Sequence, residues 1–317
     1  MFDSSFDRKT AIGASEAAAI LGLSPYETQW DVFLRKTGQA PEFSDSVYTR
    51  AGDALEPLIG QLYEERAKER IWPVTKTERH GGYHMIAATP DWLVENRSAI
   101  VEGKAVMGRS AIREYGDEES GRFPERHAVQ AMIQMAVFNR EETSIAALVD
   151  YKLRVYRVER DKDTEARMLD TLADWWRTHV EKGDPPAMDG SPAAKDWLLR
   201  KFPKNTGQML VADPVSAATM TTLIRARELQ AVAERQEEIA RGILCQLIAD
   251  KDGIEAPGIG RVTWKRTKDS QKTDWDCVAN TLAKFAPEGE FDKIVEMHTT
   301  TKPGTRRFVV TEEKDNG

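Results

Sequence analysis

The chain has 317 residues, of which 40% are hydrophobic and 31% are charged. This composition is typical of a globular protein with a hydrophobic core, and the length accommodates two domains of roughly 100–200 residues each. The net charge of −7 argues against a protein that coats nucleic acid with a basic surface, although basic side chains can still gather in one groove.

Several classes of protein are excluded by what the sequence lacks. The two cysteines, Cys245 and Cys277, are too few for a cysteine zinc site or a four-cysteine iron–sulfur cluster. No run approaches the ~18 apolar residues of a membrane span. The first residues lack the basic and then apolar pattern of a signal peptide. We therefore expect a protein of the reducing cytoplasm with no membrane partner.

Two short helices are predicted at the start of the chain, over residues 14–21 and 28–36. The first is rich in alanine and has Ser15 near its start as a candidate N-cap. The pair resembles a helix-turn-helix, which would indicate a DNA-binding regulator, but the second helix is too apolar for a recognition helix. Alternatively, Arg8 and Ser15 beside a helix N-terminus suit a phosphate group, because the first-turn N–H groups are unpaired.

A longer helix is predicted over residues 52–70 from the helical spacing of its apolar residues. Pro57 then falls in the first turn, where proline is tolerated. Glu56 lies beside the apolar stripe at the N-terminal end, where the helix dipole stabilises a carboxylate. Glu56 either completes a metal site above the sheet or serves only the start of the helix.

Two predicted strands carry the most informative residues. One covers residues 83–89 and continues through 92–94, and the other covers 100–104. Asp91 follows Pro90 at a bend of the first strand, whereas Glu102 and Lys104 point to one face of the second. Two carboxylates beside a lysine suit Mg²⁺-dependent hydrolysis of a phosphodiester, because carboxylates bind the hard cation and the ammonium orients the attacking water. The alternative is a solvated strand face of alternating charge.

A helix over residues 125–138 follows, and it carries Gln130 and Gln134 on one face. An amide near a phosphate orients a water or a DNA backbone, so we expect Gln130 in the site and Gln134 as a DNA contact. The alternative is a pair of amides at the edge of a packed helix. Strands over residues 145–149 and 153–158 and a helix over 161–180 complete this part of the chain.

A break rich in glycine and proline at residues 183–192 indicates a domain boundary. We predict a nuclease domain over residues 1–185, a linker over 186–214 and a helical and β-rich extension over 215–317. Residues 215–249 are expected to be a hairpin or a helix packed on the nuclease rather than a coiled coil. The best strands of the extension cover residues 261–265 and 306–310. There, Lys265 and Arg266 beside Trp264 either guide DNA or protect an edge strand.

Taken in order, these motifs resemble the YqaJ-type viral recombinase family, the group that includes phage lambda exonuclease, within the PD-(D/E)xK nucleases. The matching stretches are residues 8–26, 52–57, 88–91, 102–104, 124–137 and 156–161, so the resemblance covers about residues 8–185. The residue between the glutamate and the lysine is usually apolar in such motifs. Here it is Gly103, which loosens the strand.

The resemblance implies an α/β (α+β) fold with a restriction-endonuclease-like core, a mixed central sheet flanked by helices, and a helical and β C-terminal extension. It also implies roles for individual residues. These are Glu56, Asp91 and Glu102 as ligands of Mg²⁺, or of Mn²⁺ in its place; Lys104 as the catalytic lysine; Gln130 as the glutamine of the active-site helix; and Arg8 and Ser15 as contacts to the 5′-terminal phosphate of DNA.

The function that the resemblance implies is exonucleolytic digestion of double-stranded DNA ends from 5′ to 3′. This would leave 3′ single-stranded tails for a single-strand annealing protein during recombination of a phage or prophage in the bacterial cytoplasm. It also implies a homo-oligomer, a trimer as in lambda exonuclease. An endonuclease or branched-DNA nuclease on the same fold is one alternative. A DNA-binding protein without catalysis is another, although the complete set of acids argues against it.

Overall fold

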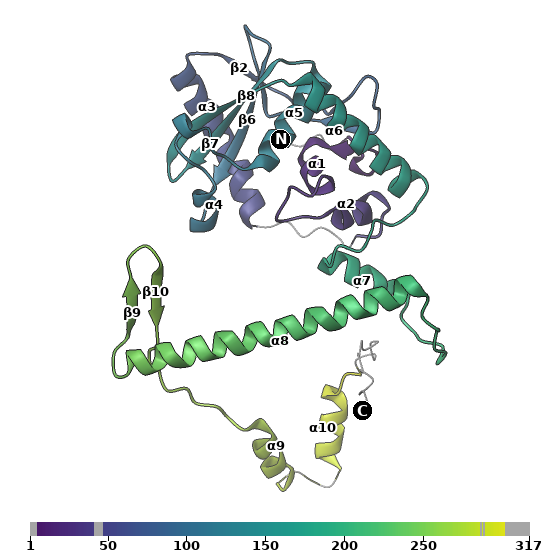
Figure 1. Cartoon of the computed structure of the whole chain (residues 1–317), viewed down its shortest axis with the longest axis vertical. Coiled ribbons are helices and arrows are strands. Elements are labelled where there is room, and N and C mark those ends of the chain that lie inside the picture. The colour runs from purple at the N-terminus through teal and green to yellow at the C-terminus, as the bar shows by residue number, and fades with distance from the viewer. Residues whose placement is uncertain (1–4, 41–46, 286, 288, 302–317) are drawn as a thin grey trace. The chain divides into compact units, whose positions relative to one another are not determined.

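A computed structural model of the chain describes residues 5–40, 47–285, 287 and 289–301 (Figure 1). The chain divides into two compact units, Met1–Lys201 and Phe202–Gly317. The helices of the first unit are α1 (Ala14–Ile20), α2 (Gln29–Lys36), α3 (Val47–Ala67), α4 (Arg109–Arg113), α5 (Glu125–Phe138), α6 (Lys162–Trp175), which a π-helical turn extends over Trp176–Glu181, and α7 (Pro192–Lys201). Its strands are β1 (Ile12–Gly13), β2 (Ile71–Pro73), β3 (Glu78–Arg79), β4 (Ile86–Ala88), β5 (Trp92–Val94), β6 (Ala99–Val106), β7 (Glu142–Val149) and β8 (Lys152–Glu159).

The central sheet of the first unit is mixed and has the strand order β2-β5-β6-β7-β8. Its β6 and β7 are parallel, and its other neighbours are antiparallel. A smaller sheet has the order β1-β4-β3. The predicted α/β fold with a mixed sheet flanked by helices is therefore confirmed.

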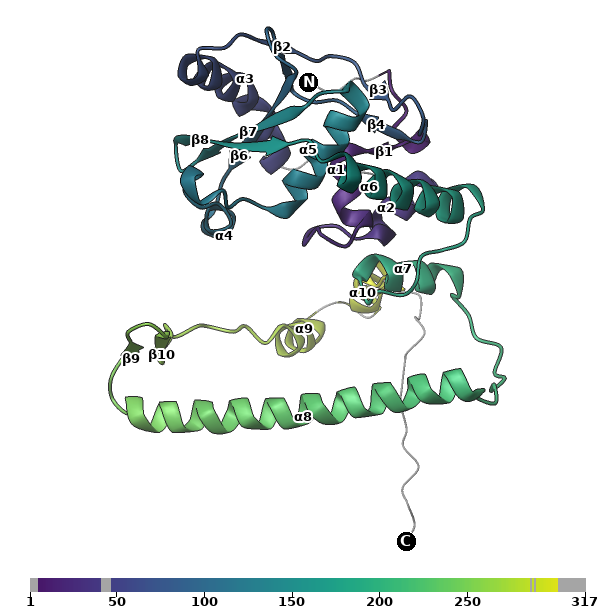
Figure 2. The ribbon, with the colours of Figure 1, turned by 45° about the horizontal axis from the view of Figure 1, so that its top comes forward.

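Helices cover both faces of the central sheet (Figure 2). On one face, Ile59 and Tyr63 of α3 pack with Val101 of β6 in a buried cluster. On the other face, Met132 and Met135 of α5 pack on Ile100. Successive residues of β6 thus enter different cores, because side chains alternate across a strand.

The end of β6 has a free edge, because β5 is much shorter than β6. Only Val101 and Ile100 pair with β5, so β6 from Glu102 onward has a strand partner on the β7 side alone. The predicted single strand through residues 83–94 is wrong. Its two parts, β4 and β5, belong to different sheets. Pro90 lies in the connection, where its fixed φ and missing N–H interrupt a strand ladder. Asp91 therefore reaches the free edge of β6 from a bend between two sheets.

Helix α3 begins earlier than predicted. It starts at Val47, so Pro57 lies inside the helix and not in its first turn. Glu56 is correspondingly in the middle of the helix, where the N-terminal dipole no longer stabilises it.

The first unit also extends further than the predicted boundary at residue 185. Helix α7 lies in the predicted linker but belongs to the N-terminal core. The ring of Trp197 lies 5.0 Å from that of Trp30, and its indole N–H donates to Gln39 Oε1 at 3.1 Å. Burial of this indole explains why the segment folds back instead of acting as a linker.

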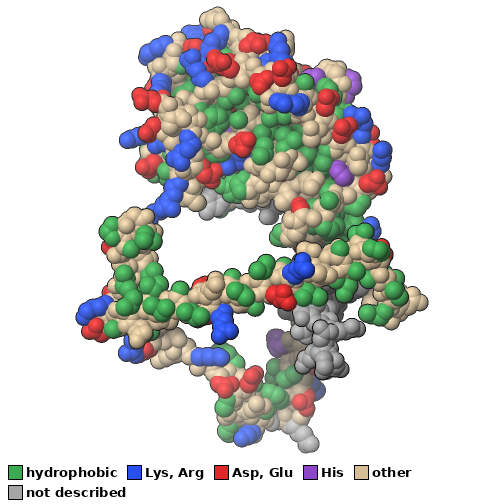
Figure 3. Space-filling model, in the orientation of Figure 1, with side chains coloured by type: hydrophobic (Ala, Val, Ile, Leu, Met, Phe, Trp, Pro, Cys, Tyr) green, Lys and Arg blue, Asp and Glu red, His purple; other side chains and the backbone are tan. Residues whose placement is uncertain are grey.

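The second unit contains α8 (Pro214–Ile248), the antiparallel pair β9 (Gly253–Ala256) and β10 (Gly260–Thr263), α9 (Trp275–Ala283) and α10 (Glu290–His298). Of the two alternatives predicted for residues 215–249, the hairpin is wrong, since α8 is one continuous helix of 35 residues. Asp213 caps it by accepting the N–H of Ser216. Exposed apolar side chains, such as Leu229, follow its length (Figure 3).

The predicted β-rich end of the second unit is only partly correct. Residues after β10 form α9 and α10, and the predicted strand over residues 306–310 lies outside the described residues. Asp274 starts α9 by accepting the N–H of Cys277. None of the helices in the described ranges is long and apolar enough to cross a membrane.

Candidate active site

One cavity of about 700 Å³ gathers the predicted site residues of the first unit. It opens where the small sheet, α3, α5 and the free edge of β6 meet. The predicted residues that line it are Arg8, Ser15, Glu56, Asp91, Glu102, Lys104, Gln130 and Gln134. Residues that lie far apart in sequence are therefore brought to one place.

The centre of this site is the carboxylate of Glu102, which is only 4% exposed. Its Oε1 accepts hydrogen bonds from Lys104 Nζ at 2.7 Å and from Gln130 Nε2 at 2.6 Å. Its Oε2 accepts from Gln134 Nε2 at 2.7 Å. The two-residue spacing along β6 and the four-residue spacing along α5 both place these donors on one side. The carboxylate is thereby held in one orientation.

Asp91 lies against the free edge of β6. Its Oδ2 accepts the backbone N–H of Gly103 at 2.7 Å, which satisfies a donor that β5 is too short to pair. Burial, together with the negative charges of Glu102 and Glu56, raises the pKa of Asp91 well above its usual value. Lys104 and the Gly103 N–H only partly offset these effects. The site therefore has a deficit of positive charge.

The ammonium of Lys104 is firmly protonated. Burial alone would lower its pKa, but the charges of Glu102 and Asp91 outweigh burial and raise it. One of its three N–H donors bonds Glu102, and the other two have no hydrogen-bond partner among the described residues. Lys104 can therefore donate to a phosphate oxygen or to a water in the cavity.

The donor chemistry of the site fits a hard divalent cation. Asp91 Oδ1 accepts no hydrogen bond from a described residue, and Glu102 Oε2 accepts only one. Carboxylate oxygens are the preferred ligands of Mg²⁺, and a cation would relieve the repulsion that raises the Asp91 pKa. Within the described residues, no group of three His, Cys, Asp or Glu side chains is drawn close enough to form a complete protein-only metal site. Mg²⁺ commonly keeps waters and substrate oxygens as its remaining ligands.

The structure changes the interpretation of Gln134. The side chain is 1% exposed, so it offers no surface for the predicted DNA contact. Its Nε2 holds Glu102, and its buried Oε1 has no hydrogen-bond partner among the described residues. Gln134 therefore acts inside the site, by orienting a carboxylate.

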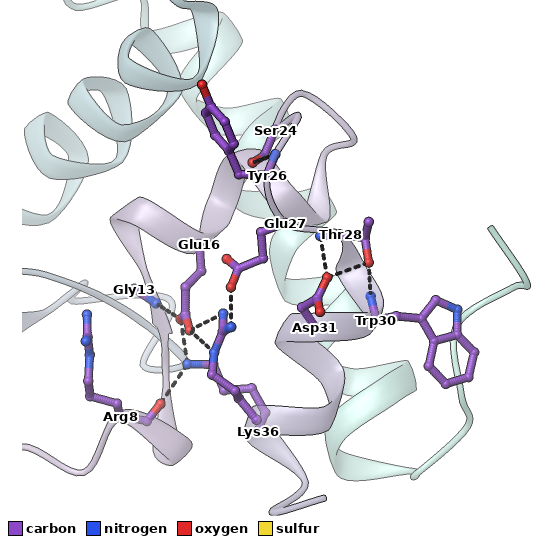
Figure 4. Close-up of polar contacts among 11 residues, drawn as sticks. Arg8, Gly13, Glu16, Ser24, Tyr26, Glu27, Thr28, Trp30, Asp31 and Lys36 are labelled. Carbon is purple, nitrogen blue, oxygen red and sulfur yellow. Dashed lines mark hydrogen bonds and ion pairs between the residues drawn. The ribbon is translucent and has the colours of Figure 1, made fainter. Parts of the chain in front are cut away.

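A buried ion-pair network supports the wall of the cavity that α1 and α2 form (Figure 4). Lys36 Nζ lies 2.5 Å from Glu16 Oε2 and also donates to the backbone carbonyl of Arg8 at 2.7 Å. Arg35 bonds the other oxygen of Glu16, while the Gly13 N–H donates to Oε2 at 2.8 Å. The network thus ties the backbone of Arg8 to both helices.

The structure of α1 and α2 excludes two of the alternatives for the N-terminal segment, the Ser15 N-cap and the helix-turn-helix. Ser15 is not the N-cap of α1, since Gly13 holds that position and Glu16 accepts its N–H. The Ser15 side chain is exposed at the cavity. Helix α2 buries Trp30 and Phe33 in the core, so it cannot serve as the recognition helix of a helix-turn-helix.

Sequence reasoning missed His127, one turn before Gln130 on α5. Burial and the charges of Lys104 and Arg126 lower its pKa to about 2, so it is neutral. Its ring lies 6.2 Å from that of Tyr115. The signal was present, because His127, Gln130 and Gln134 form a polar stripe on a helix that is otherwise apolar after its first two residues.

The predicted DNA contacts of the extension lie in the second unit. Lys265 pairs with Asp252 at 2.9 Å, and Arg266 pairs with Asp269 at 3.0 Å. On the face of the first unit seen in Figure 3, basic and acidic side chains are interspersed. That face shows no broad field of one sign.

Comparison with known proteins follows the same division of the chain. Residues 6–143 match the profile of the YqaJ-like viral recombinase domain. The uncharacterized protein YqaJ of Bacillus subtilis (strain 168) is 30% identical over 200 residues, covering 62% of this chain and 61% of that protein. The chain therefore matches about three fifths of the length of this relative.

Two solved exonuclease structures are also similar. An alkaline exonuclease from Laribacter hongkongensis is 18% identical, with a TM-score of 0.48 over 61% of this chain and 94% of that one. A phage-related exonuclease from Haemophilus somnus 129PT is 13% identical, with a TM-score of 0.45 over 55% of this chain and 96% of that one.

The matched residues 6–143 include strands β2, β5 and β6 of the mixed sheet. They also include the buried cluster of Glu102, Lys104, Gln130 and Gln134. The match of residues 6–143 to the YqaJ-like viral recombinase domain confirms, for this part of the chain, the resemblance predicted from the motifs.

Proposed function

We propose that this chain is a metal-dependent DNA exonuclease of phage-type recombination. It would digest linear duplex DNA from 5′ to 3′ and leave 3′ single-stranded tails. The observation that carries the proposal is the Glu102 carboxylate, held by Lys104, Gln130 and Gln134 beside the buried Asp91. These groups line one cavity of a viral recombinase domain.

Different side chains of the site would have different roles in hydrolysis. Lys104, charged and with two free donors, would bind a phosphate oxygen and orient the attacking water. Asp91 and Glu102, with Glu56 on the same cavity, would hold Mg²⁺, or Mn²⁺ in its place. When bound, the cation supplies Lewis-acid stabilisation of the charge that develops on the phosphate. Gln130 and Gln134 keep Glu102 in the orientation that this requires.

Replacing Gln134 by leucine should weaken the site. The change removes a donor to Glu102, and loss of such an outer partner lowers metal affinity or activity about 10–100-fold. The loss of the unpartnered buried Oε1 of Gln134 is offset by the loss of the donor to the buried Glu102 Oε2, so the unfolding midpoint is measured beside activity to show that the variant is folded. We would measure the Mg²⁺ concentration for half-maximal cleavage, with Gln230→Leu on the exposed surface of α8 as the control. An unchanged Mg²⁺ requirement would contradict this role.

Arg8 and Ser15 are proposed to bind the 5′-terminal phosphate. Both line the cavity of the acids, so a phosphate held by them would lie at the entrance to the site. Arg8→Ala should reduce digestion of 5′-phosphorylated duplex at least ~10-fold, since a lost charge-assisted hydrogen bond is worth about 1.5–3 kcal/mol. Digestion of 5′-hydroxyl duplex should change little. Equal losses on both substrates would contradict recognition of the phosphate.

The direction of digestion is tested with duplexes labelled at one end of one strand. In Mg²⁺, the label on a 5′ end should be released before a label on the 3′ end, and EDTA should stop release of both. Early release of the 3′ label would reverse the proposed polarity. The 3′ tails would then be substrates for a single-strand annealing protein, the partner that we propose, and trimeric assembly is proposed from the family resemblance.

A further inference from the structure

A tryptophan with no part in the proposed chemistry lies where three elements of the site meet. Trp92 directly follows Asp91, and its side chain is 7% exposed. It pairs with Val101 across β5 and β6 and belongs to the core beneath α3. The ring is therefore enclosed between the helix that carries Glu56 and the strand that carries Glu102.

Two glycines face the distal part of this ring. A Cβ added at Gly60 would lie 3.0 Å from Cζ2 of Trp92, and one added at Gly103 would lie 3.0 Å from Cζ3. Both distances are shorter than ordinary van der Waals contact, so the ring would have to shift by a few tenths of an ångström to admit either methyl group. The indole thus occupies the space that side chains at residues 60 and 103 would need.

Backbone conformation gives no reason for glycine at either position. Neither Gly60 nor Gly103 has a φ in the left-handed region. Glycine is unfavourable inside a helix and inside a strand compared with alanine. The Trp92 ring makes the closest approach at both glycines, and at Gly103 the Asp91 carboxylate oxygen Oδ2 would also lie 3.4 Å from the added Cβ.

Three segments around this ring each supply a carboxylate of the site: α3, the residue before β5, and β6. Gly60 is one helical turn after Glu56, so the two share a face of α3. Gly103 lies between Glu102 and Lys104, and Asp91 precedes the tryptophan itself.

We infer that Trp92 is a positioning residue whose indole, seated against Gly60 and Gly103, holds Asp91 and Glu102 beside α3 at the separation with which they would bind a divalent cation. This inference rests on the proposed function. A methyl group added at either glycine would push the ring, and with it α3 or Asp91, away from β6. Removing the distal ring atoms would relieve that pressure.

The test adds a methyl group at each glycine and removes ring atoms from Trp92, in the full chain. Mn²⁺ binding is measured by titration calorimetry without DNA, together with the Mg²⁺ requirement of cleavage and the unfolding midpoint. Gly60→Ala and Gly103→Ala should each weaken Mn²⁺ binding at least ~10-fold. Adding Trp92→Phe to either variant should restore at least ~3-fold of that loss. Gly242→Ala, inside α8 with nothing within 4 Å of the new methyl group, is the control and should match the wild type.

The outcomes separate the inference from the proposed function. Wild-type Mn²⁺ affinity in folded Gly60→Ala and Gly103→Ala, or a loss that Trp92→Phe does not relieve, would overturn the inference while the nuclease proposal stands. If the alanine variants do not fold, Trp92→Phe alone decides, with ~3-fold weaker Mn²⁺ binding expected and unchanged binding overturning the inference. A wild-type chain that neither binds Mn²⁺ nor cleaves DNA would overturn both.

Discussion

Replacing Lys104 by alanine is expected to lower the rate of DNA hydrolysis about 10²–10³-fold. That is the usual loss when one preorganised donor to developing charge is removed. The ammonium bonds Glu102 at 2.7 Å and keeps two donors for the substrate. The measurement is the rate of digestion of linear duplex at saturating Mg²⁺. Lys152→Ala, an exposed lysine at the start of β8, is the matched control.

Titration of Lys104 should not change the rate of DNA hydrolysis near neutral pH. Because the charges of Glu102 and Asp91 raise the pKa of Lys104 above its usual value, the residue stays protonated through neutral pH. The wild-type rate should therefore show no step from Lys104 near neutral pH. Retention of activity in Lys104→Ala, with the variant folded, would contradict its role in the proposed site.

The largest expected effect on stability is that of Glu16→Gln. The variant leaves the ammonium of Lys36, whose side chain is 2% exposed, without its ionic partner. Breaking a buried ion pair by removing one member costs about 3–5 kcal/mol of the free energy of unfolding. Urea denaturation at neutral pH measures the loss. The double variant Glu16→Gln/Lys36→Met should be less destabilised than the single variant, because it removes the buried charge.

The same pair predicts a pH dependence of stability. Burial opposes ionisation of Glu16, but Lys36, the Gly13 N–H and Arg35 outweigh it and hold the pKa of Glu16 below its usual 4.5. The unfolded chain therefore takes up a proton at Glu16 before the folded chain does. The stabilisation is complete above about pH 4.5 and is lost as the pH falls below it. The difference in stability between wild type and Glu16→Gln should shrink over that range. A constant difference down to pH 3 would contradict this assignment.

Local pattern was sufficient to predict much of the N-terminal unit. The helix over residues 125–138 has the predicted bounds, because its apolar period is regular and Asn139 ends it in a left-handed conformation. The pairing of Glu102 with Lys104 followed from the two-residue period of a strand. These features depend only on neighbours in sequence.

What the sequence did not predict depends on contacts between distant segments. The division of the predicted first strand into β4 and β5, on either side of Asp91, depends on these two strands belonging to separate sheets. The role of Gln134 depends on which side of α5 faces β6. Helix α7 joins the first unit because Trp197 finds Trp30 across more than 160 residues of chain. Residues 275–283, which were predicted as part of a β-rich segment, form α9 because Asp274 caps its start.

The central claim is that the cavity around Glu102 hydrolyses DNA from its ends. The most direct measurement incubates the purified chain with linear duplex and a covalently closed circle in one reaction, with Mg²⁺ or with EDTA. The account predicts loss of the linear DNA only, in Mg²⁺ and not in EDTA, and a loss about 10²–10³-fold slower in Lys104→Ala. Cutting of the circle would indicate an endonuclease on the same fold. Survival of both substrates in Mg²⁺ and in Mn²⁺ would contradict the catalytic claim.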